Sequence, residues 1–336
     1  MQKGIVKLKN PPSIHSWACV GGEKEWEGPL GDKFDHIDET NRFSMDTWEQ
    51  SENEAQRLSF NFALKKGDLA PDDIDALFAG DLINQCTGSA YGLLSFDIPF
   101  FGIYGACSTS AEALTLSALC IDSGHYDKCG AVCSSHFCSA ERQFRYPLEY
   151  GNQRTPTSQW TVTAAASFIV SKDGKGPYIT EVMPGIVYDG GINDANNMGA
   201  AMAPAAVESL LKYFRTSGKK PSFFDGIFTG DLGYEGHSIV IDLMHREGYT
   251  LWDNYYDCGM LIYDRQKQDM HAGGSGCGCS ASVLCTHILP KLKSGLWHDV
   301  LYIATGAMMS PASIQQGLSI PGIAHIIHIS SKKEKN

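Results

Sequence analysis

The sequence predicts a layered α/β fold made of two similar halves. Three observations lead to this prediction: helix and strand motifs occur twice in the same order, several strand patterns are continuously apolar, and one helix is apolar nearly all round. The chain has 336 residues and 43% hydrophobic content, which suits one large or two medium domains of an ordinary globular protein.

Two motifs are repeated. DIDALFAGDL, which contains Asp81, matches FFDGIFTGDL, which contains Asp231, and each follows a helical pattern, at 48–58 and at 205–214. GACSTSAEALTLSAL then matches GCGCSASVLCTHIL, and a strand pattern follows each, at 129–134 and at 301–306. Ordered repeats of this kind predict a duplicated fold.

The apolar runs indicate how the layers are arranged. Residues 98–104 are continuously apolar, which predicts a strand covered on both faces. The helix after Cys107 is apolar nearly all round, which predicts a central helix buried between two sheets. The polar, glycine-rich stretch 171–176 is the expected connector. The predicted units are residues 1–172, residues 173–331 and a basic tail at 332–336.

Composition limits the possible functions. The 27 basic and 38 acidic residues give a net charge of −11, which argues against a nucleic-acid partner. The opening MQKGIVKLKNPPS lacks the apolar core of a signal peptide, and no run reaches the roughly 18 apolar residues of a spanning helix, so we expect a soluble cytoplasmic protein. Cys277 and Cys279, even with Cys285, His271 and His287 nearby, lack the spacing of a structural zinc site, and we expect no metal and no cofactor.

Cys107 is the first candidate functional residue, because it lies where an apolar strand pattern meets a helical pattern. Thr109 and Glu112 have the spacing of a capping box, which predicts that the helix begins directly after Cys107. A thiol at a helix N-terminus faces unpaired N–H groups and the positive end of the helix dipole, which favour the thiolate. The same donors would bind a carboxylate, so the turn suits either nucleophilic catalysis or anion binding. The other cysteines of the eleven are expected to be buried thiols in a reducing compartment.

This combination of motifs resembles the thiolase and ketoacyl-ACP synthase III superfamily over nearly the whole chain. More narrowly, FAGDLINQ, FGIYGACSTSAEAL, FRYPLEYGNQRTPTSQWTVTAAAS, FTGDLGYEG and HAGGSGCGCSASV occur in an order that closely resembles the stage V sporulation AD family of spore-forming bacteria. The resemblance implies a thiolase-like αβαβα fold, in which two pseudo-symmetric halves, each with a mixed sheet, share buried central helices. It also implies a homodimer, with the loop Asn84–Phe96 near the interface.

The acyl-transfer chemistry of that superfamily needs three groups: a cysteine that takes the acyl group, and a His and an Asn, or a second His, from the second half. Cys107 matches the cysteine, but Gly230 and Cys277 stand at the positions of the two donors. Cys107 is therefore expected to be a vestigial nucleophile, and no catalytic residue is expected. Asp231 beside a thiolate would raise the thiol pKa and oppose activation. His237 and His271 could substitute only if a loop folds back toward Cys107.

Several other polar residues are candidate ligand contacts. Ser135 and His136 follow the strand pattern at 129–134, and Arg142, Arg145 and Arg154 lie between predicted elements. Arginines can clamp carboxylates through two parallel hydrogen bonds, although they more often pair with neighbouring acids such as Glu141 and Glu149. For Ser135 and His136 the sequence fits two interpretations equally well, a ligand contact and the end of a surface loop. The predicted ligand contacts are Cys107, Ser108, Ser135, His136, Asp231, Arg142 and Arg145.

The resemblance implies a role in sporulation. In that reading a non-catalytic pocket binds dipicolinic acid, alone or with its calcium. The protein takes part in dipicolinic acid uptake into the forespore as a soluble subunit of a membrane channel complex, at the inner spore membrane. A helix N-terminal pocket with hydroxyl donors suits a flat aromatic dicarboxylate. Two alternatives remain open: an active acyltransferase or condensing enzyme that uses Cys107, and a scaffold subunit with a vestigial pocket.

Overall fold

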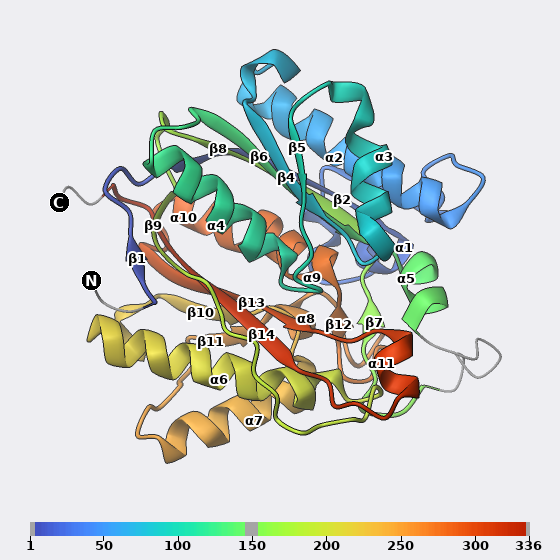
Figure 1. The fold of residues 1–336 in the computed structure, drawn as a ribbon, viewed down its shortest axis with the longest axis vertical. Helices are drawn as coiled ribbons and strands as arrows, with labels where there is room; N and C mark the ends of the chain where they lie inside the picture. Colours follow the sequence, from blue (N-terminus) through green and yellow to red (C-terminus); the bar gives the residue numbers. More distant parts are fainter. Residues whose placement is uncertain (1–3, 145–153, 334–336) are drawn as a thin grey trace.

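The computed structural model describes residues 4–144 and 154–333, and their strands fall into two matching sets (Figure 1). The first set has the order β5-β4-β6-β8-β2 and the second the order β11-β10-β13-β14-β9. In each set the first three strands are parallel and the last two are antiparallel to their neighbours. The sets meet where β2 and β9 pair at Ser13 and Tyr178. The identical strand order confirms the duplication predicted from the repeats.

The strands have the following bounds. The first set comprises β2 (Ser13–Gly22), β4 (Ala76–Gly80), β5 (Phe100–Gly102), β6 (Lys128–Ser135) and β8 (Ala164–Ser171). The second comprises β9 (Tyr178–Met183), β10 (Gly226–Thr229), β11 (Tyr255–Asp257), β13 (Asp299–Ala307) and β14 (Gly322–Ser330). Three pairs involve short strands. Strand β1 (Val6–Lys7) pairs with β9, and β3 (His36–Asp38) pairs with β2. Strand β7 (Trp160–Thr161) pairs with β12 (Gly274–Ser275). The strand patterns predicted at 129–134 and 301–306 lie within β6 and β13.

Helix α4 (Thr109–Asp122) is the buried central helix that the sequence predicts. It packs on β4, β6 and β8 of the first set and on β13, β14 and β9 of the second. Its counterpart in the second half is α9 (Cys277–Val283), which continues through the π-helical turn η7 (Leu284–Ile288) into α10 (Leu289–Lys293). The two helices touch where the Ser110 and Ser280 hydroxyls lie 3.1 Å apart. Both Cys107 and Gly276 therefore stand at the starts of adjacent buried helices.

The remaining helices cover the outside of the two strand sets or lie in connections. Two of them, α2 and α6, have 20 residues each. Helix α2 packs on β2 and β8, and α6 packs on β13 and β14. Their positions agree with the helical patterns predicted at 48–58 and 205–214. Their first turns are capped by Thr47 and Asn197. The bounds are α1 (Glu23–Trp26), α2 (Trp48–Gly67), α3 (Thr87–Leu93), α5 (Phe137–Phe144), α6 (Met198–Ser217), α7 (Gly233–Arg246), α8 (Cys258–Leu261) and α11 (Pro311–Gln315).

Two local predictions are wrong. The apolar run 98–104 does contain a strand, but β5 is an edge strand whose residues are exposed, because only β4 pairs with it. The capping box is absent as well: Thr109 is the first helical residue and its hydroxyl donates to the Ala106 carbonyl (2.6 Å). A tight turn at the helix start thus replaces the reciprocal bonds expected from Glu112.

The polar stretch 171–176, which the sequence predicts as the connector between the halves, lies between the end of β8 and the start of β9. All eleven cysteines, which lie in the described ranges, are free. Within residues 4–144 and 154–333, no helix has both the length and the apolar character needed to cross a bilayer.

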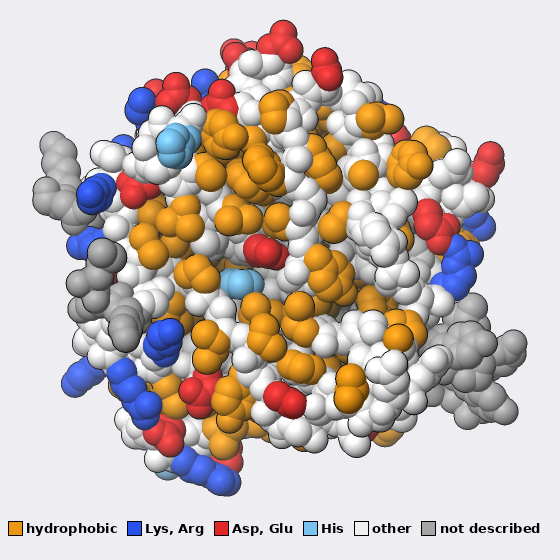
Figure 2. Space-filling view, in the orientation of Figure 1, with side chains coloured by type: hydrophobic (Ala, Val, Ile, Leu, Met, Phe, Trp, Pro, Cys, Tyr) orange, Lys and Arg blue, Asp and Glu red, His pale blue; other side chains and the backbone are white. Residues whose placement is uncertain are grey.

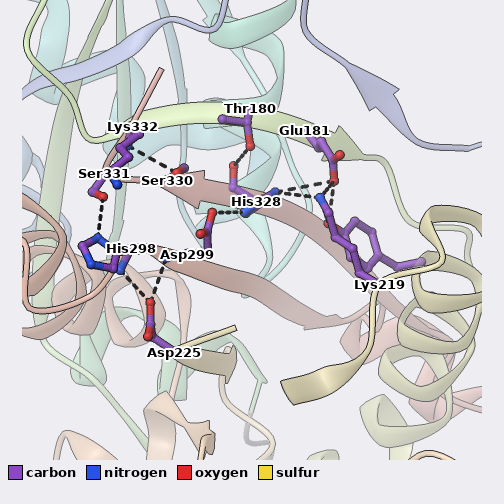
Figure 3. Close-up of polar contacts among 11 residues, drawn as sticks. Thr180, Glu181, Lys219, Asp225, His298, Asp299, His328, Ser330, Ser331 and Lys332 are labelled. Atoms are coloured by element: carbon purple, nitrogen blue, oxygen red, sulfur yellow. Dashed lines mark hydrogen bonds and ion pairs between the residues drawn. The ribbon is translucent and has the colours of Figure 1, made fainter. Parts of the chain in front are cut away.

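A buried polar network joins β9, β13 and β14 to the end of α6, near the C-terminus (Figure 3). Lys219 Nζ donates to Glu181 Oε2 (2.8 Å) and lies 3.2 Å from His328 Nδ1, while His328 Nε2 lies 2.8 Å from Asp299 Oδ1. Burial alone would raise the pKa of Glu181, but hydrogen bonds from His328, Lys219 and Tyr213 outweigh it and lower that pKa to about 2.

This network makes the fold sensitive to acid. Because the folded-state pKa of Glu181 lies below its unfolded value, its stabilising contribution is present above about pH 4.5 and is lost as pH falls toward 2. We expect Glu181→Gln to reduce the free energy of unfolding at pH 6 by an amount that shrinks by about 1–2 kcal/mol by pH 3, after allowance for solvent screening. Urea unfolding over that pH range measures the slope. Glu208→Gln, at an exposed position on α6, is the control, and an equal pH slope in both variants would contradict the account.

Candidate functional site

Cys107 lies in a tight turn between β5 and the start of α4. Ala106 adopts a positive φ of 50°, and the Ser108 hydroxyl donates to the Gly105 carbonyl (2.6 Å), so the turn is closed from within. The thiol is buried, and only 7% of the residue is exposed. The thiol lies 3.7 Å from the hydroxyl of Ser275, which belongs to the matching turn of the second half.

Asp231 is the central charged group of the site. Its Oδ2 accepts hydrogen bonds from Ser275 Oγ (2.8 Å) and from the Gly276 backbone N–H (2.9 Å), and its Oδ1 accepts one from Thr305 Oγ1 (2.9 Å). The carboxylate also lies within hydrogen-bonding reach of the Cys107 thiol. The carboxylate therefore occupies donors that could otherwise bind an oxyanion or a ligand carboxylate.

This environment disfavours the thiolate. Burial raises the pKa of Cys107 well above its ordinary value, and the neighbouring Asp231 charge raises it further. Burial also raises the pKa of Asp231, against the hydrogen bonds from Gly276, Cys107, Ser275 and Thr305. Activated cysteines have the opposite environment, with cations or a base beside the sulfur. Burial and the Asp231 charge therefore act against the helix N-terminus, which by itself would favour the thiolate.

The two positions that matched catalytic donors in the sequence, Gly230 and Cys277, are closely packed in the structure. A Cβ on Gly230 would lie 2.7 Å from the Thr305 backbone nitrogen, so the backbone leaves no space for a histidine there without rearrangement. Cys277 is fully buried and its thiol donates to the Ala106 carbonyl (3.0 Å). His237 stacks on Tyr255, with ring centroids 4.5 Å apart, and His271 lies beside Thr155 and Asp269. These contacts give neither histidine a link to Cys107.

The structure brings together two of the predicted ligand contacts, Cys107 and Asp231. Ser135 supports the second turn, because its hydroxyl donates to the Val162 carbonyl (2.7 Å) and accepts from the Gly278 N–H (3.0 Å). The remaining predicted contacts are engaged elsewhere: the Ser108 hydroxyl within its own turn, both His136 ring nitrogens with Asn41 and Cys138, and Arg142 with Glu49. Arg145 lies outside the described residues.

Sequence reasoning missed four residues that build the site: Ser275, Thr305, Gln159 and Asp257. Ser275 and Thr305 bind the Asp231 carboxylate, and Gln159 Nε2 donates to the carbonyls of Asp231 (2.6 Å) and Gly274 (2.9 Å). Asp257 accepts from the N–H groups of Leu232 and Gly233 and so holds the same loop. Burial raises the pKa of Asp257 to about 7. Only Ser275 had a sequence signal, because the repeat places its turn opposite Cys107.

The duplicated strands, the paired central helices and the cysteine at the start of α4 define a thiolase-like protein. Solved structures with this fold include cerulenin-bound OleA of Xanthomonas campestris, with a TM-score of 0.58 and 12% identity, covering 95% of this chain and 97% of that one. Another is 3-oxoacyl-[acyl-carrier-protein] synthase III of Aquifex aeolicus, with a TM-score of 0.54 and 11% identity, covering 94% and 99%.

The chain belongs to the stage V sporulation protein AD family, whose model matches residues 2–330. Stage V sporulation protein AD of Bacillus subtilis (strain 168) is 41% identical over 318 residues, which cover 95% of this chain and 94% of that protein. The family and the thiolase-like fold expected from the sequence are thus confirmed.

The electrostatics of the site can be tested on the thiol itself. Asp231→Asn removes the negative charge beside Cys107, so we expect the thiol pKa to fall and alkylation of Cys107 by iodoacetamide at pH 8.5 to accelerate by roughly 3- to 10-fold. Peptide mass spectrometry reports the rate for Cys107 alone. Asp81→Asn, at the equivalent buried position of the first half, is the matched control. Equal alkylation rates in wild type and Asp231→Asn would show that Asp231 does not control the thiol.

Proposed function

We propose that this chain is a non-catalytic thiolase-like protein that binds dipicolinic acid, alone or with its calcium. In this proposal it takes part in uptake of dipicolinic acid into the forespore, as a cytoplasmic subunit peripheral to a channel complex at the inner spore membrane. Family membership supports the role in sporulation. The observation that carries the non-catalytic assignment is the carboxylate of Asp231 beside the Cys107 thiol.

Acyl transfer would need a base for the thiol and free donors for the oxyanion. The contacts of His237 and His271 lie elsewhere and do not include Cys107. The Gly276 N–H and the Ser275 hydroxyl already bind Asp231. A developing oxyanion beside this carboxylate would be repelled rather than stabilised. The arrangement therefore supports binding better than catalysis.

A dicarboxylic acid would have to use donors other than those that hold Asp231, because Ser275, Gly276 and Thr305 already bind that carboxylate. The start of α4 is the element that favours a negative group here. Tyr104, three residues before Cys107, is 39% exposed, and burial raises the pKa of its phenol, which keeps the hydroxyl protonated as a donor. We infer that a ligand reaches the turn from the Tyr104 side, where the phenol can donate a hydrogen bond.

Calorimetric titration with dipicolinate tests this proposal. We expect saturable binding to the wild type, and binding at least 10-fold weaker to Cys107→Ala and Tyr104→Phe, because a hydrogen bond to a charged ligand contributes about 1.5–3 kcal/mol. Cys120→Ala and Tyr188→Phe remove the same groups elsewhere and are expected to bind as the wild type does. Binding to wild type that all four variants retain would place the ligand away from the turn. No binding to wild type would contradict the proposal and leave the acyltransferase and the scaffold subunit as the alternatives.

We also propose a homodimer that forms through the exposed edge of the first strand set. Figure 2 shows hydrophobic side chains gathered over the middle of the face on which α4, β5 and β14 lie in Figure 1, with most charged side chains at its rim. The interface that we propose uses exposed apolar residues of β5 and of the helical segment 87–96 before it. They are Phe100 (39% exposed), Phe101 (48%), Tyr91 (66%) and Leu94 (73%). An unpaired edge strand with exposed aromatic residues is a ready interface for a second copy.

Sedimentation velocity tests the dimer. Phe101→Glu places a charge in the proposed interface, so we expect it to shift the protein from dimer to monomer at micromolar concentration. Leu296→Glu makes a similar change at another exposed apolar position (67% exposed) and should leave the dimer intact. A wild-type monomer, or a Phe101→Glu dimer, would contradict the proposed interface.

A further inference from the structure

A cavity of about 510 Å³ lies against the second central helix, where η7 and α10 form part of its lining. Its walls come from the start of β2, the end of α2, the 3₁₀ turn η1 (Gly31–Lys33), and the segment of η7 and α10. This volume is in the usual range for small-molecule pockets. None of the residues that bind Asp231 lines it. The lining residues used below are Trp17, Lys33, Asp35, Lys66, Cys285 and Lys293.

Positive charge exceeds negative charge in this cavity. Lys33, Lys66 and Lys293 line it, whereas Asp35 is the one carboxylate among the lining residues. Asp35 is already engaged, because its Oδ1 lies 2.5 Å from Lys66 Nζ and its Oδ2 accepts from the Cys19 N–H (3.0 Å). The cavity thus has two lysines in excess, in a chain whose net charge is −11.

The two excess lysines have weak partners. Lys33 Nζ lies 4.0 Å from Asp32, whose side chain is 75% exposed, so solvent screens the pair. Lys293 Nζ lies 5.1 Å above the Trp17 ring, and no carboxylate of the described residues is within ion-pair distance of it. Burial lowers the pKa of Lys291, which lies on the same helix α10 as Lys293, and the charge of Lys33 lowers it further. The charges of Lys33 and Lys291 therefore repel each other.

One wall of the cavity is formed by η7 and is hydrogen-bonded to β2. The π-helical turn η7 interrupts the regular central helix, and Cys285 and Thr286 within it line the cavity. Trp17 Nε1 donates to the Cys285 carbonyl (3.1 Å), and this bond ties β2 to the turn. π-helical turns inside α-helices are frequent at functional sites. The turn supplies a preformed wall, so a ligand would find the site largely built.

The C-terminal dipoles of neighbouring helices explain only part of the lysine cluster. Lys66 and Lys293 lie in the last turns of α2 and α10, where cations are favourable. Lys33 ends a 3₁₀ turn of three residues, whose dipole is negligible, yet it points its charge at the same cavity. The helix dipoles therefore do not offset all of the repulsion among the lysines, and an anion that enters the cavity would reduce it.

We propose that this cavity binds the phosphate group of a small polyanion. Lysine offers a compact charge with three N–H donors and is a common phosphate binder, and three lysines line the cavity. The phosphate could belong to a dissolved metabolite or to the headgroup of a lipid. This site is separate from the Cys107 turn and goes beyond the proposed binding of dipicolinic acid.

The test uses two probes with the full-length protein. One is inorganic pyrophosphate, titrated calorimetrically at low ionic strength. The other is vesicles of phosphatidylcholine with 30% phosphatidylglycerol, used in co-sedimentation. The variants are Lys33→Gln/Lys293→Gln and, as a control that removes two exposed lysines elsewhere, Lys175→Gln/Lys267→Gln. Asp35→Asn removes the one carboxylate, and thermal unfolding of each variant checks that it folds.

We expect at least a 10-fold loss of binding in Lys33→Gln/Lys293→Gln, no change in the control, and tighter binding in Asp35→Asn. Loss of pyrophosphate binding alone assigns a dissolved ligand, and loss of vesicle binding assigns a lipid headgroup. The proposal is overturned if wild type binds neither probe, or if Lys33→Gln/Lys293→Gln binds as the control does. A variant too unstable to fold is replaced by the single substitution Lys33→Gln, at a side chain 48% exposed, with at least a 3-fold loss expected.

Discussion

The carboxylate of Asp231 is the group on which the rest of the site depends. It ties two segments of the second half to its own loop, one through Ser275 and Gly276 and the other through Thr305, and it lies beside the cysteine of the first half. A buried carboxylate needs these donors, because an unsatisfied charge in the interior costs several kcal/mol. Once they are engaged, they are no longer available to an acyl oxyanion. The group that stabilises the local fold is therefore also the group that opposes thiol chemistry.

Duplication explains why the two turns meet. Each half delivers a buried helix whose first residues lie at the same end of the molecule, so Cys107 and Ser275 come together although they are far apart in sequence. The same arrangement sends the far end of the second helix to the lysine-lined cavity. One central helix thus connects two sites of different character: an acidic, closed turn at its start and an open, cationic cavity at its end.

The repeats and apolar runs were sufficient to predict the duplication, the central helices and the position of Cys107 at a helix start, because periodicity and burial are recorded in the residue pattern. Two local features were not predictable in this way. The apolar run at β5 reads as a buried strand, but its exposure depends on which strands pair with it, and that is a property of the whole sheet. Likewise, Thr305 and Gln159 reach Asp231 from distant segments, so no local spacing identifies them. The contacts of Ser135 and His136 show the converse: residues at a plausible strand end can be fully occupied by backbone groups.

Intact-mass spectrometry after incubation with acetyl-CoA tests the central claim most directly, with a ketoacyl-ACP synthase III as positive control. A thiol held protonated beside Asp231 should take up no acetyl group while the control enzyme does. An acetyl adduct of one group per chain that maps to Cys107, and that disappears in Cys107→Ala, would contradict the account and show that the turn is still an active nucleophile.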